Sequence, residues 1–116
     1  LRNICRPYDV IGRYGGEEFL IGFIDGDSKV AIEFAERLCE FINQKPFTIG
    51  NLRLPITISL GVASCKPAGK IKKAKIHELL DELLKKTDKA LYEAKRQGRN
   101  KVAANRDIPQ KDVSYI

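Results

Sequence analysis

Two turn signals, each set between short apolar runs, restrict most strongly what this 116-residue chain can fold into. Gly15-Gly16 and Gly50-Asn51 are dipeptides that favour two-residue hairpin turns, because the primed turn types need positive φ. The first separates runs 9–14 and 19–24, and the second separates runs 47–49 and 52–54. The run 19–24 is apolar throughout, which is typical of a central strand covered on both faces. The sequence therefore predicts two β-hairpins.

Helical periodicity predicts two amphipathic helices, over residues 29–44 and 76–97. The first carries its apolar side chains on one side, at Val30, Phe34, Leu38, Phe41 and Ile42. The second carries an apolar stripe at Leu79, Leu80, Leu83, Ala90, Leu91 and Ala94. Pro46 should end the first helix, and Gly98 is a natural C′ residue after the second.

Between the helices, apolar residues alternate with small or polar ones from Ile56 to Val62. This alternation predicts a strand with one buried face and one face that allows close approach. Residues 101–103 add a short strand. The order of elements predicts a two-layer α/β (α+β) domain, with a mixed, mostly antiparallel sheet flanked by helices.

Charge and composition limit the class of protein. The net charge of +6 favours an anionic partner such as a nucleotide or nucleic acid. No apolar run approaches the roughly 18–20 residues that cross a bilayer and no signal peptide opens the chain, so we expect a cytoplasmic domain whose parent can be membrane-anchored. Three cysteines without paired spacing, Cys5, Cys39 and Cys65, fit reduced, buried thiols. The chain starts at Leu1 and lacks Met, so we expect a piece of a longer protein with 105–116 as tail or linker.

The stretch 13–19, Arg-Tyr-Gly-Gly-Glu-Glu-Phe, is the most informative for chemistry. It sets two carboxylates beside a glycine turn whose backbone amides no Cβ obstructs. Such amides can face a polyphosphate, and a carboxylate can hold the Mg²⁺ that accompanies it. The ion would neutralise phosphate charge while a hydroxyl attacks. The turn alone favours a plain hairpin with two solvated glutamates, since Gly-Gly hairpins are common.

Three segments together resemble the diguanylate cyclase (GGDEF) family. Gly15-Gly16-Glu17-Glu18-Phe19 matches the family's Gly-Gly-Asp/Glu-Glu-Phe signature, in the Glu variant associated with active members. Residues 56–63 are similar to its late core strand, and residues 88–100 to its last helix and exit. The resemblance implies a nucleotidyl-cyclase or palm-like domain over residues 1–104 that lacks the family's N-terminal strand and helix.

The resemblance implies a role for each matching residue. Glu17 is the metal-binding carboxylate for Mg²⁺ or Mn²⁺, and Glu18 is a catalytic neighbour. Gly15-Gly16 lies against the phosphates of GTP, which Lys95 and Arg99 grip. From the residues alone, the last two also fit simple complementarity with the helix dipole, a contribution of about 0.3–1 kcal/mol.

An upstream segment, Arg6-Pro7-Tyr8-Asp9, resembles the family's Arg-x-x-Asp inhibitory site at the expected spacing from the glycine turn. The resemblance implies that Arg6 and Asp9 bind the product, cyclic di-GMP, with Arg37 assisting from the neighbouring helix. Planar guanidinium groups suit both phosphate and the Hoogsteen edge of a purine. Arg6 and Asp9 also fit a plain ion pair across a turn, which contributes at most about 1 kcal/mol if exposed.

The resemblance also implies the reaction and its partners. Two subunits, each with one GTP, meet face to face, and each 3′-hydroxyl attacks the α-phosphate of the other nucleotide with release of pyrophosphate. A homodimer is then required, usually imposed by a regulatory domain N-terminal to this segment. The family's metal-sharing Asp and its guanine-reading Asn and Asp cannot be assigned here, so we expect the segment alone to be incomplete as an enzyme.

Competing classes of function remain open on the sequence. The intact Gly-Gly-Glu-Glu-Phe turn favours a cyclase, a bacterial signalling transferase under allosteric inhibition. A non-catalytic cyclic di-GMP receptor would use the Arg-x-x-Asp site instead. A nucleic-acid-binding sheet comes a distant third and nucleic acid is not an expected partner, because Phe19 and Phe23 lie in a run that looks buried rather than exposed for stacking. A cyclase with another nucleotide preference is a further alternative.

Overall fold

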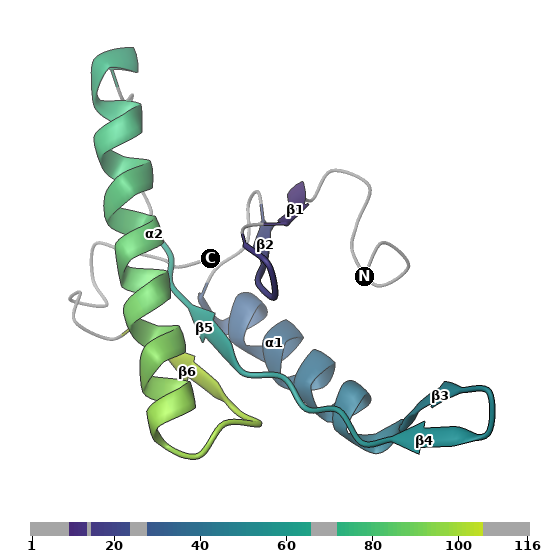
Figure 1. The fold of residues 1–116 in the computed structure, drawn as a ribbon. Coiled ribbons are helices and arrows are strands. Elements are labelled where there is room, and N and C mark those ends of the chain that lie inside the picture. The colour runs from purple at the N-terminus through teal and green to yellow at the C-terminus, as the bar shows by residue number, and fades with distance from the viewer. Residues whose placement is uncertain (1–9, 14, 24–27, 66–71, 106–116) are drawn as a thin grey trace.

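The computed structural model describes residues 10–13, 15–23, 28–65 and 72–105. Their helices and strands are, in chain order, β1 (Val10–Arg13), β2 (Phe19–Gly22), α1 (Ser28–Gln44), β3 (Phe47–Ile49), β4 (Leu52–Leu54), β5 (Leu60–Val62), α2 (Lys73–Arg96) and β6 (Val102–Ala104). The strands form two antiparallel pairs, β1–β2 and β3–β4, and one parallel pair, β5–β6 (Figure 1). The predicted α/β class with mostly antiparallel strands and flanking helices is therefore confirmed.

The first hairpin is present, but its turn differs from the prediction. Arg13 lies opposite Phe19 at the closed end of β1 and β2, so residues 14–18 connect the strands instead of two residues. Neither Gly15 nor Gly16 has φ in the left-handed region. The predicted two-residue primed turn is wrong, because the Arg13 side chain holds a wider loop by hydrogen bonds to two of its carbonyls.

The second hairpin follows the prediction closely. Phe47 lies opposite Leu54, and Ile49 lies opposite Leu52. Gly50 has a φ of 58°, the conformation that the two-residue turn demands. The hairpin projects beyond the C-terminal end of α1 and leaves these four apolar side chains exposed (Figure 1).

The core lies where β5 runs between the two helices (Figure 1). Val62 packs with Ala31 and Ala35 of α1 in the buried cluster. The preceding residue, Gly61, faces the opposite way, and a Cβ there would collide with backbone atoms of α2. The close approach predicted on the small-residue face of this strand is thus made by α2. The regular strand is shorter than predicted, since pairing with β6 begins only at Leu60.

Small residues, more than large ones, bring the helices onto the core. The buried residues of α1 are Ala31, Ala35, Leu38 and Cys39. Val30 and Phe41 of the predicted stripe stay exposed, so the buried face is rotated from the prediction. In α2, Ala90 and Ala94 are the buried members of the predicted stripe. Alanine is favoured at these contacts because it lets a helix backbone approach the strand closely.

An apolar cleft of about 450 Å³ separates the β1–β2 hairpin from the core. It is lined by β2, β5 and apolar side chains of both helices. Among the described strands β2 pairs with β1 alone, and Phe19 is 61% exposed. The prediction that this run is a central strand covered on both faces is therefore wrong for the described residues, although its composition is that of a central strand. None of the helices in the described part has the length and apolar character needed to cross a membrane.

Candidate functional site

The turn between β1 and β2 takes its shape from Arg13. Nε of this side chain donates a hydrogen bond to the Gly15 carbonyl at 3.2 Å, and Nη2 donates to the Gly16 carbonyl at 2.8 Å. The Gly15 N–H donates to the Glu18 carbonyl at 3.3 Å. A planar guanidinium fixes two acceptors at once, so the loop has a defined shape without a primed turn. Sequence reasoning gave Arg13 no role, although its place just before the glycine pair was a visible signal.

The glycines of this turn leave open space beside the backbone. Among the described residues, a Cβ on Gly16 would meet no atom within 4 Å, and one on Gly15 would meet only Cβ of Glu18, at 3.9 Å. Packing against this part of the chain therefore does not require glycine here. The absent side chains instead let another molecule approach the backbone amides closely.

An ion pair joins the turn to α2. The Lys95 ammonium lies 3.6 Å from Oε1 of Glu18, and both side chains are roughly two-fifths exposed. Pairs this exposed contribute about 1 kcal/mol or less to stability. The contact matters more for position, because it sets a cation from the last turn of α2 beside the glycine backbone. The structure thus brings together two of the predicted site residues from distant parts of the sequence.

The end of α2 is closed by a Schellman motif, as predicted for Gly98. The Gly98 N–H donates to the Lys95 carbonyl at 3.3 Å, and the Arg99 N–H donates to the Ala94 carbonyl at 3.0 Å. Gly98 has a φ of 115°. The motif turns the chain sharply, so that Arg99 leaves the helix axis four residues after Lys95.

Four cations lie near this helix end, and they differ in their partners. Lys101 donates from Nζ to the Gln97 carbonyl at 2.7 Å. Arg96 forms a two-nitrogen contact with Glu93, with Nη2 2.9 Å from Oε2. Hydrogen bonding to Arg96 lowers the pKa of Glu93 and raises the pKa of Arg96. Lys95 holds Glu18 loosely, and no described residue forms an ion pair with the exposed Arg99. Lys95 and Arg99, rather than Arg96, are therefore the cations available to an anionic ligand.

Glu17 projects from the turn as an exposed side chain. Its carboxylate oxygens are hard donors of the kind that Mg²⁺ and Mn²⁺ prefer. Within the described ranges, no cluster of three or more His, Cys, Asp or Glu side chains is arranged to hold a metal ion. Glu17 is therefore the carboxylate that the turn offers such an ion, while the neighbouring Glu18 carboxylate pairs with Lys95.

The predicted inhibitory site is only partly in view. Arg37 lies exposed on α1. Arg6 and Asp9 lie outside the described residues, so their approach to Arg37 stays a prediction. Of the cysteines, Cys39 is buried and Cys65 is half-buried, both as free thiols, and Cys5 lies outside the described residues.

The aromatic residues of the first hairpin do not share one environment. Phe23 packs edge-on against Phe34, with ring centroids 4.9 Å apart. Phe19 is largely exposed, so the expectation that both aromatics are buried is wrong for Phe19. The difference follows from α1, whose Phe34 covers the Phe23 ring.

Comparison with known proteins supplies the family. The family model described as "Diguanylate cyclase, GGDEF domain" matches residues 1–101. The chain therefore belongs to the GGDEF domain family, as the resemblance implied. The fold agrees: the active GGEEF domain of a diguanylate cyclase from Vibrio cholerae superposes with a TM-score of 0.64 at 26% identity, covering 92% of this chain and 62% of that one. The five-residue signature in that protein's description is the one at residues 15–19 here.

Several relatives of known name share this segment. Diguanylate cyclase A of Treponema denticola is 31% identical over 107 residues, which cover 92% of this chain and 27% of that protein. The response regulator PleD of Caulobacter vibrioides is 37% identical over 104 residues, covering 88% and 21%. Diguanylate cyclase DgcZ of Escherichia coli is 31% identical over 101 residues, covering 87% and 31%. The chain thus spans about a quarter of the length of these relatives.

Proposed function

We propose that this chain is the substrate-binding part of a diguanylate cyclase, which condenses two GTP molecules into cyclic di-GMP and pyrophosphate. The observation that carries the proposal is the Lys95–Glu18 contact, which places a cation from α2 beside an open Gly-Gly-Glu-Glu-Phe turn. Family membership and relatives named as diguanylate cyclases support it. So does the identity of the turn with that of an active GGEEF domain.

In the proposed reaction the residues of this chain bind and orient triphosphate. Gly15 and Gly16 lie against the phosphates, whose approach no Cβ blocks, and the Gly16 N–H faces them because the Gly15 N–H donates to the Glu18 carbonyl. Lys95 and Arg99 neutralise phosphate charge, and phosphate oxygens would compete with Glu18 for the Lys95 ammonium. The 3′-hydroxyl of one nucleotide loses its proton to solvent, and its oxygen bonds to the α-phosphorus of the other. The bond from that phosphorus to the β-phosphate oxygen breaks, and pyrophosphate leaves with the electron pair.

We propose that Mg²⁺, or Mn²⁺ in its place, accompanies the nucleotide and is held on this chain by Glu17. The exposed carboxylate beside the open turn fits a hard cation that also contacts phosphate. Such an ion supplies charge neutralisation as negative charge develops on the phosphates. Glu18 keeps the Lys95 ammonium at the turn, which is a positioning task separate from metal binding.

Because one chain presents one set of phosphate ligands, joining two nucleotides calls for two copies of the site. We propose a homodimer with the two turns facing each other, governed by a regulatory domain N-terminal to this segment. Arg6, Asp9 and Arg37 would bind the product and limit turnover. The exposure of Arg37 on α1 is compatible with ligand binding at that helix.

The open cleft bears on how the domain is completed. Apolar side chains of β2 and β5 face the cleft, and each of these strands has one described neighbour. An extended segment seated in the cleft would cover the exposed Phe19, which lines it, and would have an open strand edge to pair with. We propose that a strand from outside residues 1–116 fills this cleft in the whole protein, and that residues 1–104 are part of a larger domain.

The test is nucleotide turnover by the full-length protein with Mg²⁺, with GTP and ATP supplied separately and products resolved by chromatography. Cyclic di-GMP from GTP, with no product from ATP, supports the cyclase. Tight binding of cyclic di-GMP that is lost in Arg6→Ala, without product from either nucleotide, would favour a receptor instead. A cyclic dinucleotide formed faster from ATP would contradict the proposed substrate.

A further inference from the structure

The turn that follows α2 has an unusual backbone. Gly98, Arg99 and Asn100 have φ values of 115°, 64° and 51°. Glycine adopts such angles freely and asparagine tolerates them, but an arginine there crowds its Cβ against the backbone. Strained conformations of this kind persist only when the surrounding structure holds them. The conformation of Arg99 therefore depends on the residues that surround it.

Backbone hydrogen bonds fix the turn at both ends. On the helix side, the Arg99 N–H donates to the Ala94 carbonyl at 3.0 Å. On the strand side, the Lys101 carbonyl accepts from the Leu60 N–H at 3.0 Å, which starts the pairing of β6 with β5. These bonds define where the turn begins and ends. Among the described residues they leave Asn100, between these bonds, to be held by its side chain.

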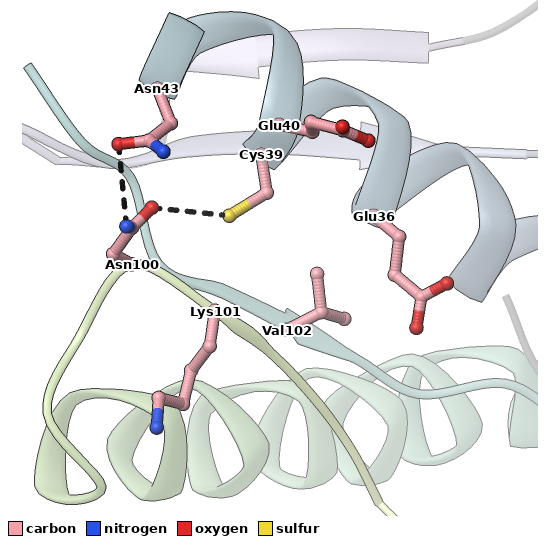
Figure 2. Close-up of a pocket in the computed structure, with 7 residues that line it drawn as sticks. All are labelled: Glu36, Cys39, Glu40, Asn43, Asn100, Lys101 and Val102. Atoms are coloured by element: carbon pink, nitrogen blue, oxygen red, sulfur yellow. Dashed lines mark hydrogen bonds between the residues drawn. The ribbon is translucent and has the colours of Figure 1, made fainter.

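The Asn100 side chain ties the middle of the turn to α1 (Figure 2). Its Nδ2 donates to Oδ1 of Asn43 at 3.4 Å. Its Oδ1 accepts from the Cys39 thiol, with Sγ 3.6 Å away, and shares that one proton with the Ile58 carbonyl at the same distance. Both halves of the amide are therefore used, beside a pocket of about 260 Å³ between the turn and the helix. An alanine here would lose both bonds and would also tolerate the left-handed backbone poorly.

The neighbouring Arg99 gains nothing comparable from its own side chain. It is exposed, and no described residue forms an ion pair with it. Its strained backbone is thus not offset by contacts that its guanidinium makes inside the described chain. An arginine kept in a costly conformation, whose guanidinium pairs with no carboxylate of the described residues, is the pattern expected of a ligand-binding residue.

We propose that Asn100 is a positioning residue for Arg99. Its amide, held by Asn43 and Cys39, keeps the turn against α1 and thereby fixes the point from which Arg99 reaches the nucleotide phosphates. The inference rests on the proposed function, in which Arg99 binds the triphosphate of GTP. In this proposal α1 joins the elements that determine substrate affinity, although Asn100, Asn43 and Cys39 do not themselves touch substrate.

The test measures the affinity of the full-length protein for GTP with Mg²⁺ by calorimetry, together with thermal unfolding. Asn100→Gly keeps a residue that accepts positive φ but removes the amide, and we expect affinity to fall about threefold to tenfold. Asn43→Ala removes one of the two bonds and should cause a smaller fall. Asn43→Asp keeps the acceptor oxygen and should restore affinity. In an Arg99→Ala background, Asn100→Gly should have no further effect on affinity.

Two results would overturn the proposal while leaving the proposed function intact. One is a loss of affinity in Arg99→Ala with none in Asn100→Gly or Asn43→Ala. The other is an equal loss from Asn100→Gly with and without Arg99, which would mean that Asn100 acts independently of it. Unchanged affinity in Arg99→Ala itself would overturn both the positioning role and the proposed phosphate contact. If Asn100→Gly unfolds, the Asn43 pair on the exposed helix surface decides the question alone.

Discussion

The Lys95 ammonium and the Glu18 carboxylate meet 3.6 Å apart, which joins the last turn of α2 to the turn of the first hairpin. We expect Lys95→Ala to raise the KM for GTP about tenfold or more, because a hydrogen bond to a charged group is worth about 1.5–3 kcal/mol. Steady-state kinetics on the full-length protein measure this. Lys85→Ala, an exposed lysine on the same helix, is the matched control and should leave KM unchanged. Equal KM values for Lys95→Ala and the control would remove Lys95 from the site.

Arg13 shapes the turn through two carbonyls at once. Lysine keeps the charge but lacks the planar fork, so Arg13→Lys should loosen the loop. We expect the KM for GTP to rise about threefold to tenfold, with little change in melting temperature because the contact is exposed. Arg53→Lys, on the second hairpin, serves as control. A fall in melting temperature without a change in KM would show that Arg13 supports the fold and not the site.

Gly61 is required by the contact between β5 and α2. A Cβ there would meet the Leu91 Cα at 2.8 Å and other backbone atoms of α2, which cannot move aside as a side chain can. Gly61→Ala should therefore lower the free energy of unfolding by about 3 kcal/mol, the upper end for overpacking. Urea denaturation measures it. Gly12→Ala is the control, since a Cβ there meets nothing within 4 Å. Similar stabilities for the two variants would contradict the close approach.

The fold is predictable from sequence where local chemistry decides it. Gly50 takes the positive φ that the two-residue turn before β4 needs. Gly98 takes the positive φ that closes α2. The first hairpin turn is not predictable this way, because its shape depends on Arg13 reaching over two residues to bond glycine carbonyls. The buried face of α1 likewise depends on tertiary packing, since Ala31 and Ala35 pack with Val62 of β5 in the core cluster.

The candidate site shows the same limits. Residues 15–19, Lys95 and Arg99 are recognisable from the family resemblance, and local spacing places Lys95 near a helix end. No periodicity predicts that Lys95 meets Glu18, since that contact depends on how α2 crosses the hairpin. The tie from Asn100 to α1 is likewise a product of tertiary packing.

Burial raises the pKa of the Cys39 thiol above its ordinary value of 9.0. Because the pKa of this thiol is higher in the folded protein than in the unfolded chain, the thiol contributes stability that is fully present below pH 9. That stability is lost as pH rises through the folded pKa. We expect the difference in free energy of unfolding between wild type and Cys39→Ala to shrink from pH 9 upward. Urea denaturation from pH 7 to pH 10 measures it, and Cys65 cancels because both proteins contain it. A difference that grows with pH would contradict the assigned direction.

The central claim, that the Gly-Gly-Glu-Glu-Phe turn and the end of α2 form a GTP site with a metal at Glu17, is tested most directly by one comparison. The rate of cyclic di-GMP formation from GTP and Mg²⁺ is measured for the full-length protein, for Glu17→Gln and for Glu33→Gln, an exposed control on α1. We predict that Glu17→Gln loses at least a hundredfold in rate while keeping its melting temperature, because the amide is a poor metal ligand. We predict no change in Glu33→Gln. Equal rates for all three proteins would contradict the metal-binding role of Glu17 and with it the account of the site.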